Sequence, residues 1–357
     1  MKGRALATGS KVTVVITTFD RPDYLGECLA SIRQQTLKDF RLVVLDNASA
    51  ADYSDVLDRF RDLPLSYVRN ERNIGAANNL AKAMRCYSDS RYLVVFHDDD
   101  LMHPRMLEWE CELLESDPKI QFVSTELAVF DDGTAPPLAR WANVELETEV
   151  YNDASDLARS LLGSGGLCFG STMYRTSVLS QITFDEPRFS IISDRPFLLD
   201  VARLGKCALI RAPLVMYRHH PGQDTNTGRL SAKNLIELMK AYRAAFPATW
   251  GRADQVLFYH HAVNFLLRYG YDRLPPEERI GAVRFIQSCI RGGVLRLSDV
   301  RAGDLANLLR TDGRRVAPAA IDAARAVKRR FASRQPKAAD TQEASLIDRR
   351  QARPPDE

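Results

Sequence analysis

The first 130 residues alternate between apolar runs of strand length and segments with helical periodicity. The runs are rich in β-branched residues, and the segments between them repeat apolar side chains every three or four positions. Strands and helices that alternate in this way form a mostly parallel sheet with helices on both faces. The pattern therefore predicts an α/β fold, with strands at 11–19, 41–46, 65–70, 91–96 and 120–130 and helices that start near 22, 52, 76 and 104.

Composition places the chain among ordinary globular proteins. The 357 residues include 49 Lys or Arg and 46 Asp or Glu, a net charge of +3, and 45% of them are hydrophobic. This balance excludes a fully disordered, fibrous or integral membrane protein. The N-terminal segment has no apolar signal region, and no run approaches the about 20 apolar residues of a spanning helix. We therefore expect a cytoplasmic protein, or one bound peripherally to the inner membrane face.

The sequence pattern changes along the chain and predicts four regions. Strand–helix alternation gives way to irregular segments near residue 131, to helical periodicity near 231, and to a Pro-, Gln- and Arg-rich composition at the end. The predicted regions are a flexible N-terminus at 1–10, an α/β domain at 11–230 (in two parts, 11–130 and 131–230), a helical region at 231–335 and a disordered tail at 336–357.

Polar residues follow four of the predicted strands at their carboxyl ends. In an open α/β sheet these ends form the crevice in which ligands bind, so one pocket would collect all four clusters. Each cluster alone also has a local explanation, because Asp and Asn cap helices and form turns. Their repetition at one edge favours a binding site. The clusters are Thr17–Asp20, Asp46–Ser49, Arg69–Asn73 and His97–Asp100.

Three consecutive carboxylates, Asp98 to Asp100, follow the apolar strand at 91–96. Adjacent carboxylates repel one another unless a cation neutralises them, and Mg²⁺ or Mn²⁺ takes oxygen ligands. Because side chains alternate along an extended segment, we expect Asp98 and Asp100 to face the pocket and Asp99 to turn aside. The sequence therefore predicts a divalent cation site, with a solvated acidic turn as the alternative.

The segment Asn73–Asn78 precedes a predicted helix and lacks large side chains. Such a segment allows the backbone at a helix N-terminus to approach a phosphate or a ribose closely, although it is also an ordinary helix entry. The chain contains neither a P-loop motif nor G-x-G-x-x-G after the first strand. A P-loop enzyme and a dinucleotide-binding fold are therefore not supported.

Taken together, these motifs resemble the inverting family 2 glycosyltransferases, which have the Rossmann-like GT-A fold of nucleotide-diphospho-sugar transferases. The resemblance covers about residues 11–227. It implies transfer of a sugar from a nucleoside diphosphate donor, with a divalent metal on the diphosphate. The segments that carry it are TVVITTFDRPDYLGECLASI, RLVVLDNAS, RNERNIGAANNLAKA, VVFHDDDLMHP, FDEPRFSIISDRPFLLDVARLGKCALI and VMYRHH.

The resemblance also implies roles for single residues. Asp100 would bind the metal together with His220, with His219 as the alternative to His220. Asp194 falls where the family keeps its catalytic base, although Ser193 stands where the family usually has Glu. The nucleotide pocket would be lined by Thr18, Asp20, Asp46, Asn73, Gly75 and Asp98, with Asp46 at the base and Asp98 at the ribose.

A carboxylate at Asp194 suits the chemistry that the resemblance implies. The acceptor hydroxyl must lose a proton while it attacks the anomeric carbon, so a nearby carboxylate acts as general base. Attack in one step from the face opposite the leaving group inverts the configuration. The alternative is a structural role, in which Ser193 or Asp194 caps the helix that includes Pro196.

The substrates and partners are less determined by the sequence. The resemblance favours a UDP-sugar as the donor and a hexosyltransferase-type reaction in polysaccharide biosynthesis. The acceptor would be a glycan, a lipid-linked sugar or a small molecule. The basic segment 324–331 suits either an anionic membrane surface or a solvated helix end. The sequence allows either a monomer or a homo-oligomer. Nucleic-acid binding is disfavoured because the basic cluster has no aromatic residues interleaved with it.

Two other functions compete with transfer. One is a non-catalytic nucleotide- or glycan-binding module of the same fold. The other is a sugar-nucleotide pyrophosphorylase, which needs a Gly-rich phosphate loop with a basic residue after the first strand. The segment Thr17–Asp20 does not provide such a loop.

Overall fold

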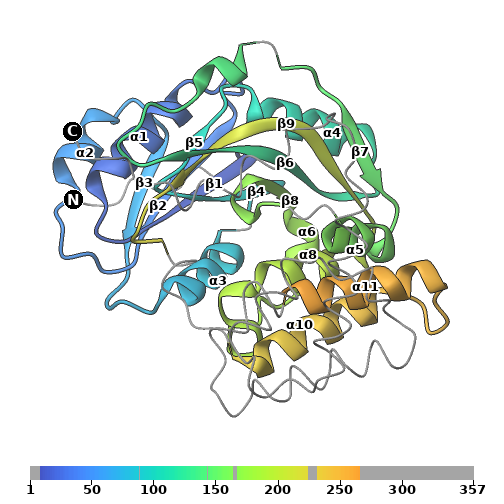
Figure 1. The fold of residues 1–357 in the computed structure, drawn as a ribbon. Coiled ribbons are helices and arrows are strands. Elements are labelled where there is room, and N and C mark those ends of the chain that lie inside the picture. The colour runs from blue at the N-terminus through green and yellow to red at the C-terminus, as the bar shows by residue number, and fades with distance from the viewer. Residues whose placement is uncertain (1–8, 88, 143, 164–166, 224–230, 266–357) are drawn as a thin grey trace, which may run out of the picture. The chain divides into compact units, whose positions relative to one another are not determined.

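The computed structural model describes residues 9–87, 89–142, 144–163, 167–223 and 231–265 (Figure 1). These residues belong to one compact unit that spans 1–282, and a second unit, 283–357, lies outside the described part. In the described residues a central sheet lies between two layers of helices. The prediction of an α/β fold is therefore confirmed.

The amino-terminal half of the sheet is parallel. Strand β1 (Val12–Thr18) pairs with β2 (Phe40–Asp46) and β4 (Tyr92–His97), and β2 pairs with β3 (Leu65–Arg69). The helices that connect these strands are α1 (Pro22–Arg33), α2 (Ser54–Arg59) and α3 (Ala76–Cys86). The register sets Thr18 beside Asp46 and Thr17 beside His97, so the three central strands end at one edge of the sheet.

The other half of the sheet is mixed. Strand β6 (Ile120–Asp131) does not pair with β4, because the short β8 (Thr172–Arg175) lies between them and is antiparallel to both. Strand β9 (Lys206–His219) is parallel to β6 and antiparallel to β5 (Leu101–Met102) and β7 (Thr148–Tyr151). The order is β3-β2-β1-β4-β8-β6-β9-β5, with β7 beside β9. Because β9 pairs with β5, the residues at the end of β9 reach the turn that follows β4.

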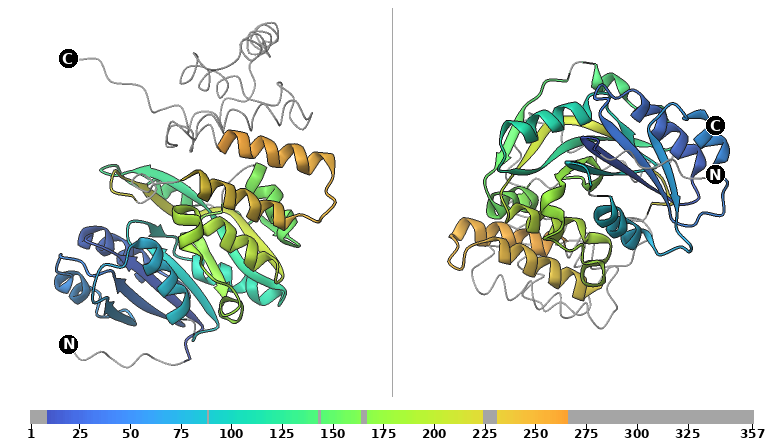
Figure 2. Two further views of the ribbon diagram at one scale, coloured as in Figure 1. Left: turned by 90° about the horizontal axis from the view of Figure 1, so that it is seen from below. Right: turned by 180° about the vertical axis from the view of Figure 1, so that it is seen from behind.

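Each face of the sheet buries its own hydrophobic cluster, because successive strand residues point to opposite faces. On one face, Val14 and Ile16 belong to a cluster with residues of α1, α2 and α4 (Met106–Ser116). On the other face, Val15 and Leu45 belong to a cluster with α3, α5 (Ala154–Gly163) and α8 (Asp194–Ala202). Figure 2 shows these layers from two further sides.

The remaining short elements are η1 (Leu138–Trp141), η2 (Phe169–Ser171), α6 (Thr176–Leu179), α7 (Glu186–Phe189) and η3 (Ser190–Ile192).

The helical region expected from residue 231 begins with α10 (Ala232–Ala245) and α11 (Arg252–Phe265). The hydroxyl of Ser231 accepts the backbone N–H of Asn234 and so caps α10. Leu238, Tyr242 and Phe258 are buried in the same hydrophobic cluster as residues of α5 and α8. Helices α10 and α11 therefore pack into the same compact unit as the sheet.

No helix in the described ranges is both long and apolar enough to cross a membrane. The predictions for 266–335, including the basic segment 324–331, for the tail at 336–357 and for residues 1–8 lie outside the described residues.

Candidate active site

The three carboxylates after β4 are buried in a turn. Strand β4 ends at His97, and residues 98–100 turn before β5 begins. Asp98, Asp99 and Asp100 are 2%, 6% and 0% exposed. Burial raises the pKa of Asp98 to about 7 and the pKa of Asp100 well above its usual range, and the charge of Asp99 adds to both shifts. The repulsion among these groups favours a cation at this turn.

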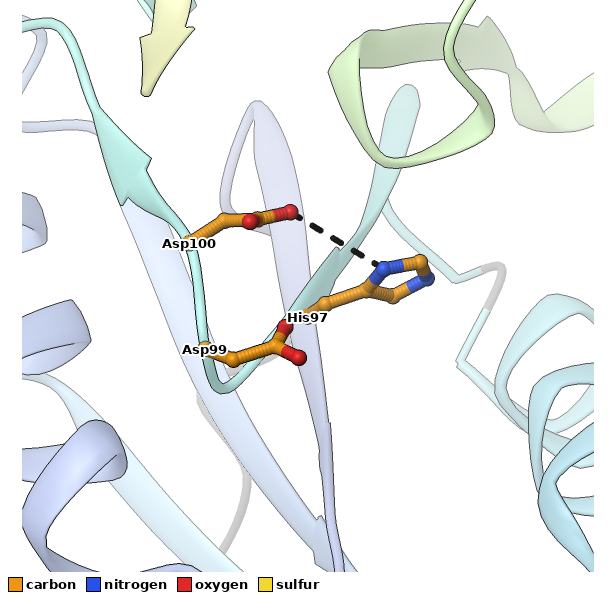
Figure 3. Close-up of side chains that lie close together, drawn as sticks. All are labelled: His97, Asp99 and Asp100. Carbon is orange, nitrogen blue, oxygen red and sulfur yellow. Dashed lines mark ion pairs between the residues drawn. The ribbon is translucent and has the colours of Figure 1, made fainter. Parts of the chain in front are cut away.

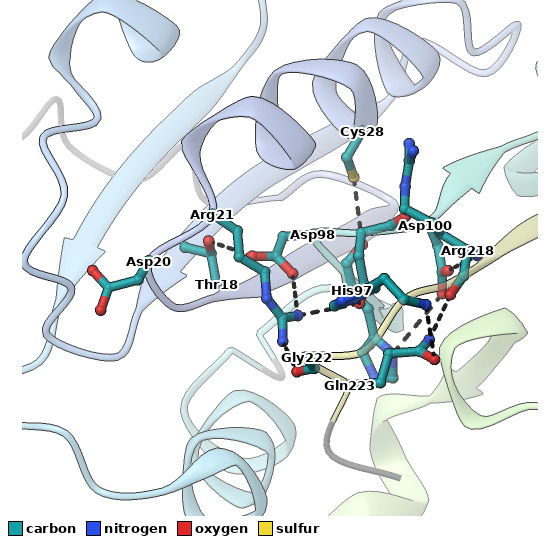
Figure 4. A network of polar contacts seen from close by, with 12 residues as sticks. Thr18, Asp20, Arg21, Cys28, His97, Asp98, Asp100, Arg218, Gly222 and Gln223 are labelled. Carbon is teal, nitrogen blue, oxygen red and sulfur yellow. Dashed lines mark hydrogen bonds and ion pairs between the residues drawn. The ribbon is translucent and has the colours of Figure 1, made fainter. Parts of the chain in front are cut away.

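Two arginines neutralise part of this charge (Figure 4). Arg218, near the end of β9, is buried; its backbone N–H donates to Asp100 Oδ1 and its Nε donates to the Asp99 carbonyl, each at 3.0 Å. Arg21, which follows β1, donates from Nη1 to Asp99 Oδ2 at 3.1 Å and lies 3.4 Å from Asp98 Oδ1. Its Nη2 donates to the carbonyl of Gly222 at 2.7 Å. The cluster thus connects the turns after β1 and β4 with the segment after β9.

One oxygen of Asp100 accepts no hydrogen bond from any described residue. Oδ1 accepts the backbone N–H of Arg218, whereas Oδ2 is buried and has no hydrogen-bond donor among the described residues. A buried carboxylate oxygen is costly unless a donor or a cation satisfies it. Asp100 therefore has the chemistry expected of a cation ligand.

Figure 3 shows the side chains of His97, Asp99 and Asp100 around one space. One ligand atom from each of the three lies within 4.8 Å of the others. The prediction that Asp99 turns aside is therefore wrong, because residues 98–100 form a turn and do not alternate as strand residues do. Asp98 instead accepts a hydrogen bond from Thr18 Oγ1 at 2.6 Å. His97 was predicted only as a member of the cluster His97–Asp100 and not as a metal ligand. Its position directly before the carboxylates was a signal for that role.

The two candidate histidines lie in different surroundings. His220 is buried, and its Nε2 is 2.9 Å from Asp99 Oδ2. His219 points elsewhere, and its Nδ1 is 3.2 Å from Oδ1 of the exposed Asp131. Of the pair, His220 is therefore the one at the acidic cluster.

A chain of hydrogen bonds connects the acidic cluster with Asp46 at the end of β2. Thr18, which donates to Asp98, lies 2.9 Å from the hydroxyl of Tyr53. Ser49 Oγ donates to Asp46 Oδ1 and lies 3.4 Å from that same hydroxyl. These five side chains are buried. The predicted base-binding and ribose-binding carboxylates are therefore coupled through protein groups.

Asp46 itself is completely buried and hydrogen-bonded at both oxygens. Oδ1 accepts from the backbone and side chain of Ser49, and Oδ2 accepts from the hydroxyl of Tyr67 at 2.6 Å and lies 3.2 Å from Arg69 Nε. Burial and the charge of Asp46 raise the pKa of Tyr67 above its usual range. A nucleobase N–H would have to replace one of these donors to reach Asp46.

The other predicted nucleotide-site residues lie in the loops that follow β1 and β3. Asp20 adopts φ +53° and accepts the backbone N–H of Ala50 at 2.6 Å. Asn73 Oδ1 accepts from the side chain of Asn47 at 2.9 Å and from the backbone N–H of Gly75 at 2.8 Å. Gly75 precedes α3 as its N-cap residue. Its φ of +83° favours glycine, and the position of its missing Cβ faces open space. The backbone before α3 is therefore accessible to a ligand.

Asp194 is the first residue of α8 and is half-buried. Burial raises the pKa of its carboxyl, while the charge and the backbone N–H of Arg195 oppose this shift. The side chain of Ser193 does not cap the helix and donates instead to the carbonyl of Ser190. Ser193 therefore does not cap α8, whereas the Asp194 carboxyl accepts a backbone N–H at the start of this helix.

The charges of Asp194 and Asp100 both act on the thiol of Cys168. The thiol of Cys168 has its pKa raised to about 12, mainly by burial and further by the charges of Asp100 and of Asp194. The segment that contains Cys168 continues into η2, which packs against β4. Asp194 and Asp100 therefore share Cys168 as an electrostatic neighbour.

Comparisons with known proteins agree with this architecture. The sequence profile described as Glycosyl transferase family 2 matches residues 13–183. The uncharacterized glycosyltransferase MJ1057 of Methanocaldococcus jannaschii is 24% identical over 230 residues, which are 63% of this chain and 76% of that protein. The uncharacterized glycosyltransferase alr2836 of Nostoc sp. is 25% identical over 274 residues, which are 73% of this chain and 77% of that protein.

A solved structure is similar in fold to this chain. The structure of S. aureus TarS 1-349 in complex with UDP-GlcNAc aligns with a TM-score of 0.58 and 17% identity, over 90% of this chain and 92% of that one. At this level of identity the likeness shows the fold alone. The profile match and the related glycosyltransferases support a glycosyltransferase of family 2, and the likeness to TarS supports the GT-A fold.

Proposed function

We propose that this enzyme transfers a sugar, with inversion, from a nucleoside diphosphate donor to an acceptor hydroxyl, and that a divalent cation assists the reaction. The observation that carries the proposal is the buried Oδ2 of Asp100, which accepts no hydrogen bond within the described residues. It lies among buried carboxylates at the ligand-binding edge of a glycosyltransferase sheet. The TarS structure named above contains UDP-GlcNAc, which supports a UDP-sugar as the donor.

The residues at the acidic turn fit a divalent cation, Mn²⁺ or Mg²⁺. Asp100 would supply a ligand through Oδ2, and His220 lies beside the cluster through its contact with Asp99. When bound there, such a cation supplies positive charge for the diphosphate that leaves. The chain's own contribution is to hold the carboxylates in place through Arg218, so that the site is ready before the donor arrives.

Asp194 is proposed as the general base. The acceptor hydroxyl gives its proton to the Asp194 carboxylate while the hydroxyl oxygen bonds to the anomeric carbon. The bond from that carbon to the diphosphate oxygen breaks in the same step, and the electron pair leaves with the nucleoside diphosphate. The raised pKa of Asp194 makes its carboxylate a better proton acceptor than an exposed aspartate.

The nucleotide is proposed to lie across the ends of β1, β2 and β4. Asp98 and Thr18 would contact the ribose side, and Asp46 would reach the base by exchanging one of its present donors. Asp20, Asn73 and the open backbone at Gly75 would line the remainder of this pocket. The acceptor is proposed to be a glycan, a lipid-linked sugar or a small molecule in polysaccharide biosynthesis, with a peripheral membrane position for the enzyme.

Replacement of the base tests the proposal against its main alternative, a nucleotide-binding module without turnover. The Asp194→Asn variant should lose at least about a thousandfold of the transfer or donor-hydrolysis rate while its affinity for UDP stays within about twofold. The control is Asp200→Asn, which changes a carboxylate of the same helix that pairs with Arg203 at the surface. Full activity of Asp194→Asn would contradict the assignment of the base, and nucleotide binding without any turnover by the wild type would favour the binding module.

A further inference from the structure

The imidazole of His97 faces the acidic turn and is not part of the function proposed above. His97 is the last residue of β4, and its Nδ1 lies 3.9 Å from Asp100 Oδ2 (Figure 3). That oxygen is the buried one that accepts no hydrogen bond from the described residues. The two atoms therefore face each other across a space that another group can fill.

The spacing of these atoms suits two ligands of one ion. Ligands that each lie about 2.1 Å from a cation are about 3 to 4 Å apart, depending on the angle between them. The separation of 3.9 Å between His97 and Asp100 falls in this range. Asp99 offers a third ligand atom, and all three atoms lie within 4.8 Å of one another. The set is one imidazole and two carboxylates.

The ring of His97 packs beside Gly170 of η2. A Cβ at residue 170 would lie 3.7 Å from the ring, which is an ordinary van der Waals distance. The side chain of His97 is 37% exposed, whereas that of Asp100 is fully buried. The ring thus lies at the open side of the cluster, where an ion can enter.

The nitrogen ligand decides which ions fit this set. Mg²⁺ takes oxygen ligands and keeps much of its water, whereas a first-row transition ion gains more than Mg²⁺ from an imidazole nitrogen, with Mn²⁺ gaining least in that series. A site made of carboxylates alone would bind Mg²⁺ and transition ions with similar preference. An imidazole nitrogen facing Oδ2 of Asp100 would favour the transition ion.

We propose that His97 is a direct ligand of the cation at Asp100 and that its nitrogen selects a first-row transition ion such as Mn²⁺ over Mg²⁺. This inference rests on the proposed function in one respect, namely that Asp100 binds a cation at all. It adds a ligand and a preference among ions to that site.

Direct binding of the ions tests the inference without an activity assay. The loss of the free Mn²⁺ signal in electron paramagnetic resonance measures Mn²⁺ binding, with the metal alone and with UDP present, and Mg²⁺ binding follows from competition. The variant His97→Leu removes the nitrogen, and His97→Gln offers an oxygen in its place. The control is His219→Leu, because His219 pairs with Asp131. Circular dichroism confirms that each variant is folded.

We expect His97→Leu to weaken Mn²⁺ binding at least about tenfold, while Mg²⁺ binding changes less than about threefold. His97→Gln should keep ion binding but lose most of the preference for Mn²⁺. His219→Leu should match the wild type. Equal losses for both ions, or unchanged Mn²⁺ binding in His97→Leu, would overturn the inference.

The variant Asp100→Asn separates this inference from the proposed function. Mn²⁺ binding that depends on Asp100 but not on His97 overturns the role of His97 and leaves the cation site in place. Mn²⁺ binding that depends on neither residue overturns both, as does the absence of Mn²⁺ binding by the wild type with UDP present.

Discussion

The guanidinium of Arg21 lies 3.1 Å from Asp99 Oδ2, the oxygen that His220 Nε2 also contacts at 2.9 Å. Arg21 thus places a positive charge beside the carboxylates that are proposed to bind a cation. Its side chain is 26% exposed, whereas that of Arg218 is 5% exposed. Arg218 is therefore the more deeply buried of the two cations, and Arg21 is the one nearer to solvent.

The first prediction concerns competition between Arg21 and the cation. Since like charges repel, Arg21→Gln should raise the affinity for Mn²⁺ about threefold to tenfold, as measured by isothermal titration calorimetry. The matched control is Arg105→Gln, which removes an exposed arginine that pairs with Glu108. Mn²⁺ affinity that falls or stays the same in Arg21→Gln would show that this charge does not oppose the cation.

The second prediction concerns the pH dependence of transfer. Asp194 must be ionised to accept a proton, and burial raises its pKa above the usual range of aspartate. The rate should therefore fall as pH decreases through that raised pKa and level off above it. The charge of Arg195 lowers this pKa, so Arg195→Gln should move the acidic limb of the kcat profile to higher pH.

The control for this shift is Arg203→Gln, which removes a surface arginine that follows the same helix. It should leave the acidic limb where the wild type has it. An acidic limb that does not move in Arg195→Gln would contradict the assignment of the limb to Asp194.

The third prediction concerns the hydrogen bonds between Asp46 and Asp98. The hydroxyl of Tyr53 joins Thr18 to Ser49 and accepts the backbone N–H of Arg21 at 3.0 Å. Because hydrogen bonds of this kind contribute about 1 kcal/mol each, Tyr53→Phe should weaken UDP binding about threefold to tenfold.

Calorimetry with Tyr151→Phe provides the comparison for Tyr53→Phe. Tyr151 is also buried, and its hydroxyl lies 3.0 Å from Ser160 Oγ, in a part of the sheet away from Asp46 and Asp98. It should bind UDP like the wild type. Equal effects of the two substitutions would mean that Tyr53 acts only on general stability.

The fourth prediction concerns Glu110 on α4. Both of its carboxylate oxygens are buried and accept no hydrogen bond from the described residues, and burial raises its pKa well above the ordinary 4.5. The folded protein therefore keeps a proton that the unfolded chain releases above about pH 4.5. The free energy of unfolding should then decrease as pH rises beyond that value. Glu110→Gln should flatten this decrease.

Urea denaturation between pH 5 and pH 8 measures the effect of Glu110→Gln. Glu112→Gln changes an exposed carboxylate of the same helix and should keep the wild-type slope. If Glu110→Gln and the wild type lose stability equally as pH rises, Glu110 is ionised in the folded protein.

The parallel half of the fold was predictable because its signals are local. The strands at 11–19, 41–46 and 91–96 are apolar runs, and β1, β2 and β4 lie within one residue of these bounds. Their parallel order also placed Thr18, Asp46 and Asp98 at one edge of the sheet. These features follow from periodicity and from the rule that ligands bind at the carboxyl ends of strands.

The rest depends on contacts between distant segments. Strand β8 has four residues and enters the sheet between β4 and β6, and no local pattern predicts that pairing. The same limit applies to Arg218, which reaches Asp100 only because β9 pairs with β5. The prediction that Asp99 faces away from the pocket is wrong because it assumed that the strand continues through residues 98–100. The strand ends at His97, and side chains in the turn that follows do not alternate.

The central claim is that a divalent cation and a nucleoside diphosphate bind together at Asp100. Thermal unfolding with UDP, dTDP, GDP or CMP, each with and without Mn²⁺, tests it on the wild type, Asp100→Asn and the surface control Asp58→Asn. A ligand present at 100 times its dissociation constant stabilises the native state by about 2.7 kcal/mol, or several degrees in Tm. We predict that UDP raises Tm only when Mn²⁺ is present, that Asp58→Asn behaves like the wild type, and that Asp100→Asn loses the effect. The same rise in Tm without Mn²⁺ or in Asp100→Asn would contradict the account.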